Sequence, residues 1–234
     1  MRHIGIIMSA GKGLRFGTET PKQYMELAGM PVICHSLKVM EESFLDEIII
    51  VTGFGDEEYV RDNFVRFYGI SKVTEIVPGG AERFDSVRNG LDAVSFSESE
   101  DSAEDVYVYI HDAARPMLTQ ALLNRLKEDV LKYGATVAAV PSKDTIKVVD
   151  ENGNVVNTPK RSALYNVQTP QAFKLSAIKA AYAEMGRFAN AFVTDDAEVM
   201  ERYSSLTVHI TEGDYKNIKI TTPEDIFIAE KYLN

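Results

Sequence analysis

The sequence predicts an α/β protein with a doubly wound, Rossmann-like and mostly parallel sheet, from which a β-hairpin arm projects. Short apolar runs alternate with segments that carry apolar residues at helical spacing, and this alternation is typical of such sheets. The apolar runs are continuous and end at glycine or polar residues, as buried parallel strands do. A hairpin signal later in the chain interrupts the alternation.

The alternating elements follow one another from the N-terminus to residue 141. The acidic, serine-rich segment 95–105 is predicted to be a solvated loop between a helix and a strand. We expect helices on both faces of one sheet in a single domain. Strands are expected at 3–9, 47–53, 72–80, 106–112 and 135–141, and helices at 31–43, 57–69, 82–94 and 119–134.

The segment after residue 141 breaks this rhythm. "DTIKVVDENGNVVNTPKR" (144–161) has two short β patterns around "ENGN", which is the strongest hairpin signal in the chain. A hairpin cannot serve as a crossover, so we expect residues 142–168 to form an inserted β-arm that pairs with a second subunit. Helices at 174–186 and 195–203, a strand at 206–213 and a helix at 223–233 are expected to follow.

The bulk composition excludes several classes of protein. The 234 residues are 45% hydrophobic and 26% charged, with a net charge of −10 and a pI of about 5.0. Such a chain is not a general nucleic-acid binder, although a local basic pocket can still hold a small anion. The single cysteine rules out an internal disulfide, and no apolar run has the length of a membrane span. Because the chain enters a strand at once, we expect no signal peptide and a cytoplasmic protein.

The first strand leads into "SAGKGLRFGTETPKQY" (9–24), which has the glycines of a phosphate-binding loop. Its spacing fits neither the Walker motif nor the dinucleotide fingerprint. Glycines allow close approach of the backbone to a ligand, and Lys12, Arg15 and Lys22 add positive charge. The loop is therefore predicted to hold an anion. A tight turn with solvated lysines is the alternative.

Two more segments with unusual chemistry follow predicted strands. "GGAERFDSV" (79–87) supplies two glycines and Ser86, although a plain turn and helix cap would look the same. "HDAARP" (111–116) places Asp112 at the end of a strand and Arg115 close by, which suits a cation bridged to phosphate oxygens. A structural Asp–Arg pair is the alternative. No second His or Cys accompanies His111, so a zinc site is not expected.

The last two segments lie near the C-terminus. "GDYKNIKITTPED" (213–225) puts Lys216, Lys219 and two threonines after the last strand, where a threonine-capped helix would give the same pattern. In "FVTDDAEV" (192–199), Thr194 either caps a helix or supplies a group to a pocket. In open α/β sheets the ligand lies beyond the carboxyl ends of the strands. These segments are therefore expected to meet there.

Seven ordered motifs resemble those of the 2-C-methyl-D-erythritol 4-phosphate cytidylyltransferase family, over nearly the whole chain. They are "SAGKGLRFG…PKQY", "GGAERFDSV", "HDAARP", "KDTIK", "VQTPQAF", "TDDA" and "NIKITTPED". Ribitol-5-phosphate cytidylyltransferases share most of these motifs, but "HDAARP", "ERFDSV" and "TDDA" look more like the methylerythritol enzymes. The resemblance implies one nucleotidyltransferase domain over residues 1–234, which transfers CMP from CTP to a polyol phosphate.

The resemblance also implies roles for individual residues. Arg15 and Lys22 would be catalytic, because they bind the phosphates of CTP. Asp112 would take Mg²⁺. Nucleotide-binding residues would be Ser9, Ala10, Gly11, Gly13, Gly80, Ala81, Ser86, Asp112 and Arg115. Residues of the acceptor site would be Thr145, Arg161, Thr169, Thr194 and Lys219.

The sequence departs from the family pattern in two places. Ala81 stands where some members have an acidic residue that contacts the base. Lys216 stands where some members place a carboxylate near the metal, and Asp214 is the nearest substitute.

Three other functions remain as alternatives at this point. A ribitol-5-phosphate cytidylyltransferase would make CDP-ribitol from the same fold. A nicotinamide-dependent oxidoreductase would need the dinucleotide spacing, which the chain lacks, and a clear acidic residue for the ribose after the second strand, which we do not find. A catalytically inactive nucleotide-binding regulator should have lost Arg15, Lys22 or Asp112, and all three are present.

Overall fold

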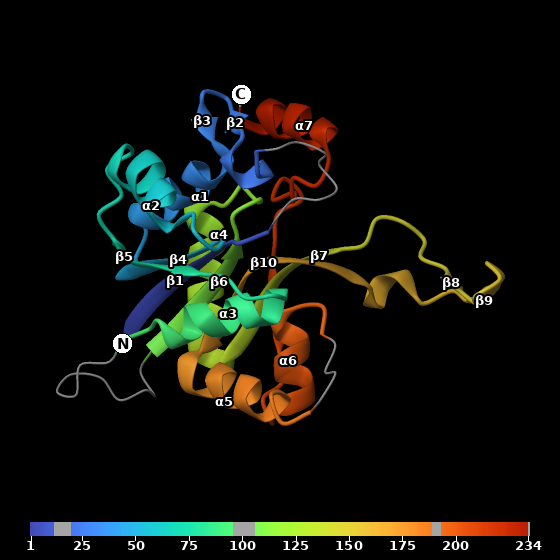
Figure 1. Cartoon of the computed structure of the whole chain (residues 1–234). Helices are drawn as coiled ribbons and strands as arrows, with labels where there is room; N and C mark the ends of the chain where they lie inside the picture. Colours follow the sequence, from blue (N-terminus) through green and yellow to red (C-terminus); the bar gives the residue numbers. More distant parts are fainter. Residues whose placement is uncertain (12–19, 96–105, 189–192, 234) are drawn as a thin grey trace.

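In a computed structural model, residues 1–11, 20–95, 106–188 and 193–233 are described. Their seven-stranded central sheet has the order β11-β7-β10-β6-β1-β4-β5 (Figure 1). The strands are β1 (Arg2–Ser9), β4 (Glu47–Thr52), β5 (Val73–Pro78), β6 (Val106–Asp112), β7 (Ala135–Pro141), β10 (Tyr165–Lys174) and β11 (His209–Glu212). All run parallel except β10, which is antiparallel to both of its neighbours. This confirms the doubly wound, mostly parallel α/β fold.

The strand β10 is the one large element that the sequence patterns did not predict. Pro170 lies in its middle and forms a cis peptide bond with Thr169. The pairing with β7 shifts register there, between Val167 and Gln171. A proline cannot donate to the ladder, so its presence argues against a central strand in a sequence reading. The shift leaves room for it in the structure.

Helices cover both faces of the sheet (Figure 1). α1 (Val32–Glu41), α2 (Glu57–Val60) and α4 (Gln120–Tyr133) pack on one face. The α2 helix continues as a π-helical segment, Arg61–Arg66, where the sequence predicted one continuous α-helix. α3 (Arg83–Asp92), α5 (Leu175–Met185) and α6 (Asp196–Tyr203) pack on the other face. Isoleucines of β1 alternate between the two cores, because successive side chains of a strand point to opposite faces.

Three further elements frame the carboxyl edge of the sheet. A small hairpin of β2 (Glu26–Leu27) and β3 (Met30–Pro31) follows the 3-10 turn η1 (Lys22–Tyr24). The helix α7 (Pro223–Leu233) packs beside it through Ala229 and Ile226, against Leu27. In the described part of the chain, every helix is too short or too polar to cross a bilayer.

The arm projects from the body of the molecule after β7 (Figure 1). Its tip is a short hairpin of β8 (Val148–Val149) and β9 (Val155–Asn157), followed by the 3-10 turn η4 (Arg161–Ala163). The expected arm covered residues 142–168, and the last four of these belong to β10, which carries the chain back into the sheet. The arm is therefore an excursion between two neighbouring strands.

Candidate active site

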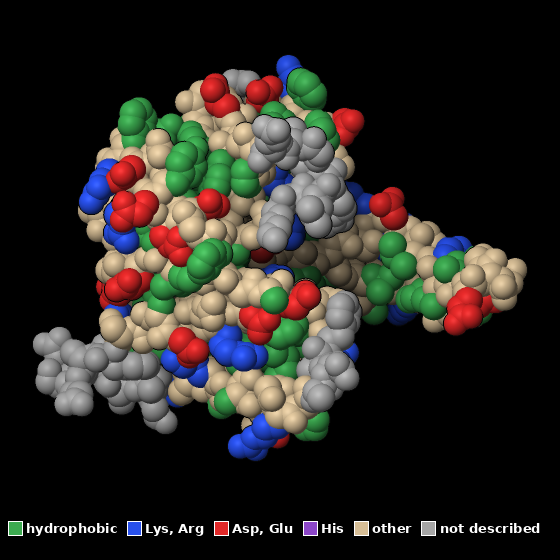
Figure 2. Space-filling view, viewed as in Figure 1, with side chains coloured by type: hydrophobic (Ala, Val, Ile, Leu, Met, Phe, Trp, Pro, Cys, Tyr) green, Lys and Arg blue, Asp and Glu red, His purple; other side chains and the backbone are tan. Residues whose placement is uncertain are grey.

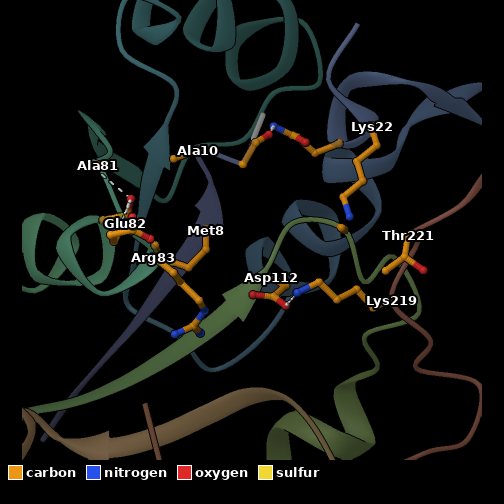
Figure 3. A pocket seen from close by; sticks show the side chains of 14 residues that line it. Met8, Ala10, Lys22, Ala81, Glu82, Arg83, Asp112, Lys219 and Thr221 are labelled. Carbon is orange, nitrogen blue, oxygen red and sulfur yellow. Dashed lines mark hydrogen bonds and ion pairs between the residues drawn. The ribbon is translucent and has the colours of Figure 1, made fainter. Parts of the chain in front are cut away.

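A cavity of about 610 Å³ opens at the carboxyl ends of β1 and β6 (Figure 3). Figure 2 shows the hollow in the middle of one face, with Lys and Arg side chains at its edge. This is where a doubly wound sheet binds its ligand. The lining residues are Met8, Ala10, Gly11, Lys22, Gln23, Gly80, Ala81, Glu82, Arg83, Ser86, Asp112, Ala114, Lys219 and Thr221.

The loop before α3 forms one wall of the cavity, and we call residues 79–86 the nucleotide wall, after the role that the sequence resemblance predicts for this segment. A Cβ atom on Gly79 would lie 2.8 Å from Ser86 Oγ and would collide with Ala10. A Cβ atom on Gly80 would collide with Asp85. The Gly80 amide donates a hydrogen bond of 3.0 Å to Ser86 Oγ, which holds the turn against the helix. Both glycines are thus required by the close packing of this turn against Ala10 and the start of α3.

The end of β1 adjoins this wall and continues the rim of the cavity. Gln23 donates from Nε2 to the carbonyl oxygens of Ser9 at 2.7 Å and Gly11 at 3.1 Å, and so ties η1 to the start of the loop. Lys22, next to Gln23, lines the cavity together with Gly11. Sequence reasoning gave Gln23 no role, although it lies within the quoted "PKQY". The predicted residues Gly13 and Arg15 lie outside the described residues.

Asp112 lies at the centre of the cavity and is surrounded by cations. Its Oδ2 atom is 2.7 Å from Lys219 Nζ and 3.9 Å from Arg115 Nε. Burial raises the pKa of Asp112, but the charges of Lys219, Arg83 and Arg115 outweigh this effect, so its pKa lies below the usual range. The carboxylate is therefore ionised at neutral pH. Figure 3 shows the Lys219 side chain extending to Asp112, which lies at the end of β6.

A buried hydrogen-bond network lies behind Asp112. The Asp112 amide donates to Thr169 Oγ1 at 3.0 Å, and Thr169 Oγ1 is 3.1 Å from His111 Nδ1. His111 Nε2 is 3.0 Å from the carbonyl oxygen of Arg115. Burial lowers the pKa of His111 to about 4, so the ring is neutral at neutral pH. A neutral ring that accepts at Nδ1 and donates at Nε2 satisfies every partner in this network.

Two predicted site residues belong to this network and not to the lining of the cavity. The Thr169 hydroxyl is bonded to His111 and to the Asp112 amide, so it acts within the protein in this structure. Arg115 donates from Nη1 to the carbonyl oxygen of Asn217 at 2.8 Å, and Asn217 donates from Nδ2 to the Thr169 carbonyl at 2.8 Å. These contacts fix the segment that presents Lys219.

The structure also adds a cation to the cavity lining that the sequence did not single out. Arg83 lines the cavity and forms a bidentate pair with Asp196, with N–O distances of 2.9 and 2.8 Å. The two residues lie 113 positions apart. The only sequence signal was the position of Arg83 inside "GGAERFDSV".

The remaining acceptor residues do not line the cavity within one chain. Thr145 and Arg161 lie exposed on the arm, where Arg161 Nη1 is 3.5 Å from the carbonyl oxygen of Lys143. Thr194 lies just before α6 and donates from Oγ1 to Glu198 Oε2 at 2.8 Å. Asp195 is the N-cap of α6, which makes Thr194 the residue before the cap.

The residues present fit a magnesium ion only in combination with a substrate. Among residues 1–11, 20–95, 106–188 and 193–233, no three His, Cys, Asp or Glu side chains gather into a metal site. Asp214, the proposed second carboxylate, accepts from the Lys216 amide at 2.8 Å and is not among the lining residues. Magnesium often binds to one or two carboxylates plus substrate phosphates and keeps several waters, and the ionised Asp112 suits that mode.

Comparisons with known proteins agree with this geometry. The sequence profile of the family described as "IspD: 2-C-methyl-D-erythritol 4-phosphate cytidylyltransferase" matches residues 4–234. Relatives with that enzyme name from Lachnospira eligens and Alkaliphilus oremlandii are 48% and 44% identical to the chain over 231 and 229 residues. Each alignment covers 97% of this chain, and they cover 97% and 93% of the respective relatives.

A solved structure shows the same likeness in three dimensions. The crystal structure of 4-diphosphocytidyl-2C-methyl-D-erythritol synthase from Anaerococcus prevotii has a TM-score of 0.84 and is 33% identical to the chain. The superposition covers 99% of this chain and 98% of that one. With a profile match over almost every residue, this chain belongs to the IspD family of 2-C-methyl-D-erythritol 4-phosphate cytidylyltransferases.

Proposed function

We propose that this protein transfers CMP from CTP to 2-C-methyl-D-erythritol 4-phosphate, giving 4-diphosphocytidyl-2-C-methyl-D-erythritol and pyrophosphate in non-mevalonate isoprenoid biosynthesis. The family makes it a CTP-dependent nucleotidyltransferase. The observation that carries the proposal is the cavity itself. A glycine turn and the end of β1 face a buried carboxylate with Lys219 beside it, which suits a nucleotide triphosphate and its counter-ion.

The chemistry needs charge and position more than a general base. A phosphate oxygen of the acceptor, already anionic, attacks the α-phosphorus of CTP. The bond from that phosphorus to the bridging oxygen breaks, and pyrophosphate leaves in line. Lys22 and Lys219 both line the cavity and would stabilise the charge on the transferring group. The neutral, fully bonded His111 has no proton to move in this scheme.

We propose Mg²⁺ as the cofactor, held by Asp112 and the phosphates of CTP. When bound, the ion supplies neutralisation of phosphate charge and polarisation of the phosphorus centre. Lys219 forms an ion pair with Oδ2 of Asp112 in this structure, and the Asp112 carboxylate is ionised, as a ligand of the metal would need to be. Arg15 and Lys22 remain the proposed catalytic cations. Nucleotide binding by Ser9, Ala10, Gly11, Gly13, Gly80, Ala81, Ser86 and Arg115 also remains a proposal.

We propose that the protein is a homodimer held together through its arm. The arm exposes Ile146, Val148, Val149, Val155 and Val156, between 42% and 61% of their surfaces. Figure 2 shows hydrophobic side chains gathered there. A lone hairpin is marginally stable, and monomers seldom expose such a cluster.

In a dimer, the arm would bring two acceptor residues to a cavity that they do not reach within one chain. Arg161 and Thr145 would then complete the acceptor site of the partner, next to Thr169, Thr194 and Lys219. The cytoplasmic location also stays a prediction. The single cysteine, Cys34, is buried and free, which suits a reducing compartment.

The proposed reaction is tested by a comparison of two acceptors. The protein is incubated with CTP, Mg²⁺ and either methylerythritol 4-phosphate or ribitol 5-phosphate, and pyrophosphate release is followed. We expect release with the methylerythritol compound at a far higher kcat/KM. Preference for ribitol 5-phosphate would overturn the proposed acceptor, and no release with either compound would overturn the proposed function.

A further inference from the structure

An ion pair that is buried at its Asp196 end and partly exposed at its Arg83 end joins the beginnings of two helices beside the cavity. Arg83 is the first residue of α3, and Asp196 is the first residue of α6. Both oxygens of the Asp196 carboxylate accept from the guanidinium, at 2.9 Å from Nη1 and 2.8 Å from Nη2. Asp196 is fully buried. Such a fork-to-fork pair fixes both distance and orientation between its two elements.

A third residue, from α5, binds to the carboxylate of this ion pair. Tyr182, on α5, donates its hydroxyl to Asp196 Oδ1 at 2.6 Å. Tyr182 is itself almost fully buried, so it contacts neither the cavity nor solvent to a useful extent. Every bond of this cluster is therefore internal. We call Arg83, Asp196 and Tyr182 the strut.

The strut connects the wall of the cavity that would bind CTP to the helix start behind Thr194, a residue that would contact the acceptor in the proposed reaction. Its Arg83 end belongs to the nucleotide wall and lines the cavity, where Figure 3 shows it extending from Ala81 and Glu82 past Met8 toward Asp112. Its Asp196 end starts α6, directly after Thr194. Gln171 of β10 fixes the same helix start, donating to Asp195 Oδ2 at 2.9 Å and accepting from the Ala197 amide at 3.0 Å.

The charges argue against a phosphate-binding role for Arg83. Its two terminal nitrogens are both directed to a buried carboxylate, which neutralises the guanidinium. A guanidinium whose charge is already balanced by a buried carboxylate attracts a triphosphate less strongly than an unbalanced one. The same geometry is well suited to hold α6 in place, because a bidentate pair resists both sliding and rotation.

We propose that the strut positions the acceptor, and not CTP, by holding the start of α6 and Thr194 at a fixed place relative to the nucleotide wall. This inference rests on the proposed function, since it assigns a role within that reaction. The nucleotide wall is braced independently by the Gly80–Ser86 hydrogen bond and by close packing at both glycines. The start of α6 is braced by Gln171 and by the strut, so loosening the strut should act on the acceptor side.

Two variants test the strut without removing charge from the cavity. Tyr182→Phe keeps the ring and removes one hydrogen bond. Arg83→Lys keeps the cation and removes the bidentate geometry. Matched controls are Tyr203→Phe on α6, whose ring packs on Phe188, and Arg88→Lys on α3, which lies 3.8 Å from Asp85 at the surface.

The experiment compares the effect of each variant on the acceptor KM with its effect on the dissociation constant of CTP. We expect the acceptor KM to rise about fivefold in Tyr182→Phe and about tenfold or more in Arg83→Lys, within the ~5–150-fold range of coupling between sites. The dissociation constant of CTP, titrated alone with Mg²⁺, should stay within about twofold of wild type, because the nucleotide wall keeps its own bonds. Both controls should match wild type in every parameter.

Four results would overturn the proposal. An equal rise in the CTP dissociation constant would mean that the strut holds the nucleotide wall. A lower melting temperature with an unchanged acceptor KM would make it a purely structural pair. A wild-type protein with no acceptor-dependent turnover would remove the proposed function, and the strut's role with it. In contrast, an active wild type with unaffected variants would remove the strut alone.

Discussion

Replacement of Asp112 by asparagine tests the charge arrangement at the centre of the cavity. Asparagine has the same shape, so the substitution leaves Lys219, at 2.7 Å, and Arg115, at 3.9 Å, without a counter-charge. A hydrogen bond to a charged group contributes ~1.5–3 kcal/mol. Because the Lys219 side chain is 39% exposed, screening favours the lower part of this range, about 2 kcal/mol. At ~2–4 °C per kcal/mol for a chain of this size, the melting temperature should fall by about 4–8 °C.

The effect of the same substitution on turnover should be larger. Loss of the carboxylate that holds the metal against the phosphates should lower kcat by about 10²–10³, the usual result of removing one electrostatic group from a transition state. Thermal melting and pyrophosphate release measure the two effects. Asp92→Asn is the control, since Asp92 is 62% exposed and its pair with Lys179 lies outside the cavity. An Asp112→Asn protein with wild-type melting and turnover would refute the assigned role of Asp112.

Four other predictions follow from the same account. Lys22→Ala or Arg15→Ala should lower turnover by about 10²-fold with little change in melting temperature, since each donor to transition-state charge is worth ~3 kcal/mol; near-normal turnover would remove the triphosphate assignment. Chelation of divalent ions should abolish pyrophosphate release and added Mg²⁺ should restore it, whereas chelator-resistant turnover would exclude the metal. Arg161→Ala should raise the acceptor KM far more than the CTP KM. If Arg161 completes the partner's site, mixing the Arg161→Ala and Lys22→Ala proteins should restore part of the activity, and a fully active monomer would contradict this. Burial, and then the charge of Lys127, lower the pKa of His3. The free energy of unfolding, measured by urea denaturation, should therefore fall as the pH drops below about 6.5, because the unfolded chain then binds the proton more tightly. A His3→Gln protein with the same pH dependence would contradict this prediction.

The sequence predicted the parallel part of the fold because its strands obey simple local rules. Apolar runs such as residues 3–9 and 106–112 pair with each other along the whole of β6, from Val106 opposite Arg2 to Asp112 opposite Met8. The strand β10 escaped prediction because Pro170 breaks the pattern expected of a central strand, and only the register shift in the folded sheet accommodates it. The π-helical turn after α2 has no local signal that separates it from an α-helix.

The candidate site was predicted as a set of neighbouring segments but not as a set of contacts. Lys219 and Asp112 were each selected from their own motif, and the structure adds the ion pair between them. Arg83 and Asp196 were not paired, because a single sequence carries no information on which distant charges meet. Thr169 was assigned to the acceptor, and its bonds to His111 and Asp112 could be seen only once β10 was in place.

The fate of a labelled α-phosphate tests the central claim most directly. The protein is incubated with Mg²⁺, methylerythritol 4-phosphate and CTP that carries ³²P at the α position, and the products are separated. We predict that the label moves quantitatively into a cytidine diphosphate ester of the acceptor, with one unlabelled pyrophosphate released per turnover. Label that stays in CTP, or that appears as CMP whether or not the acceptor is present, would contradict cytidylyl transfer by this protein.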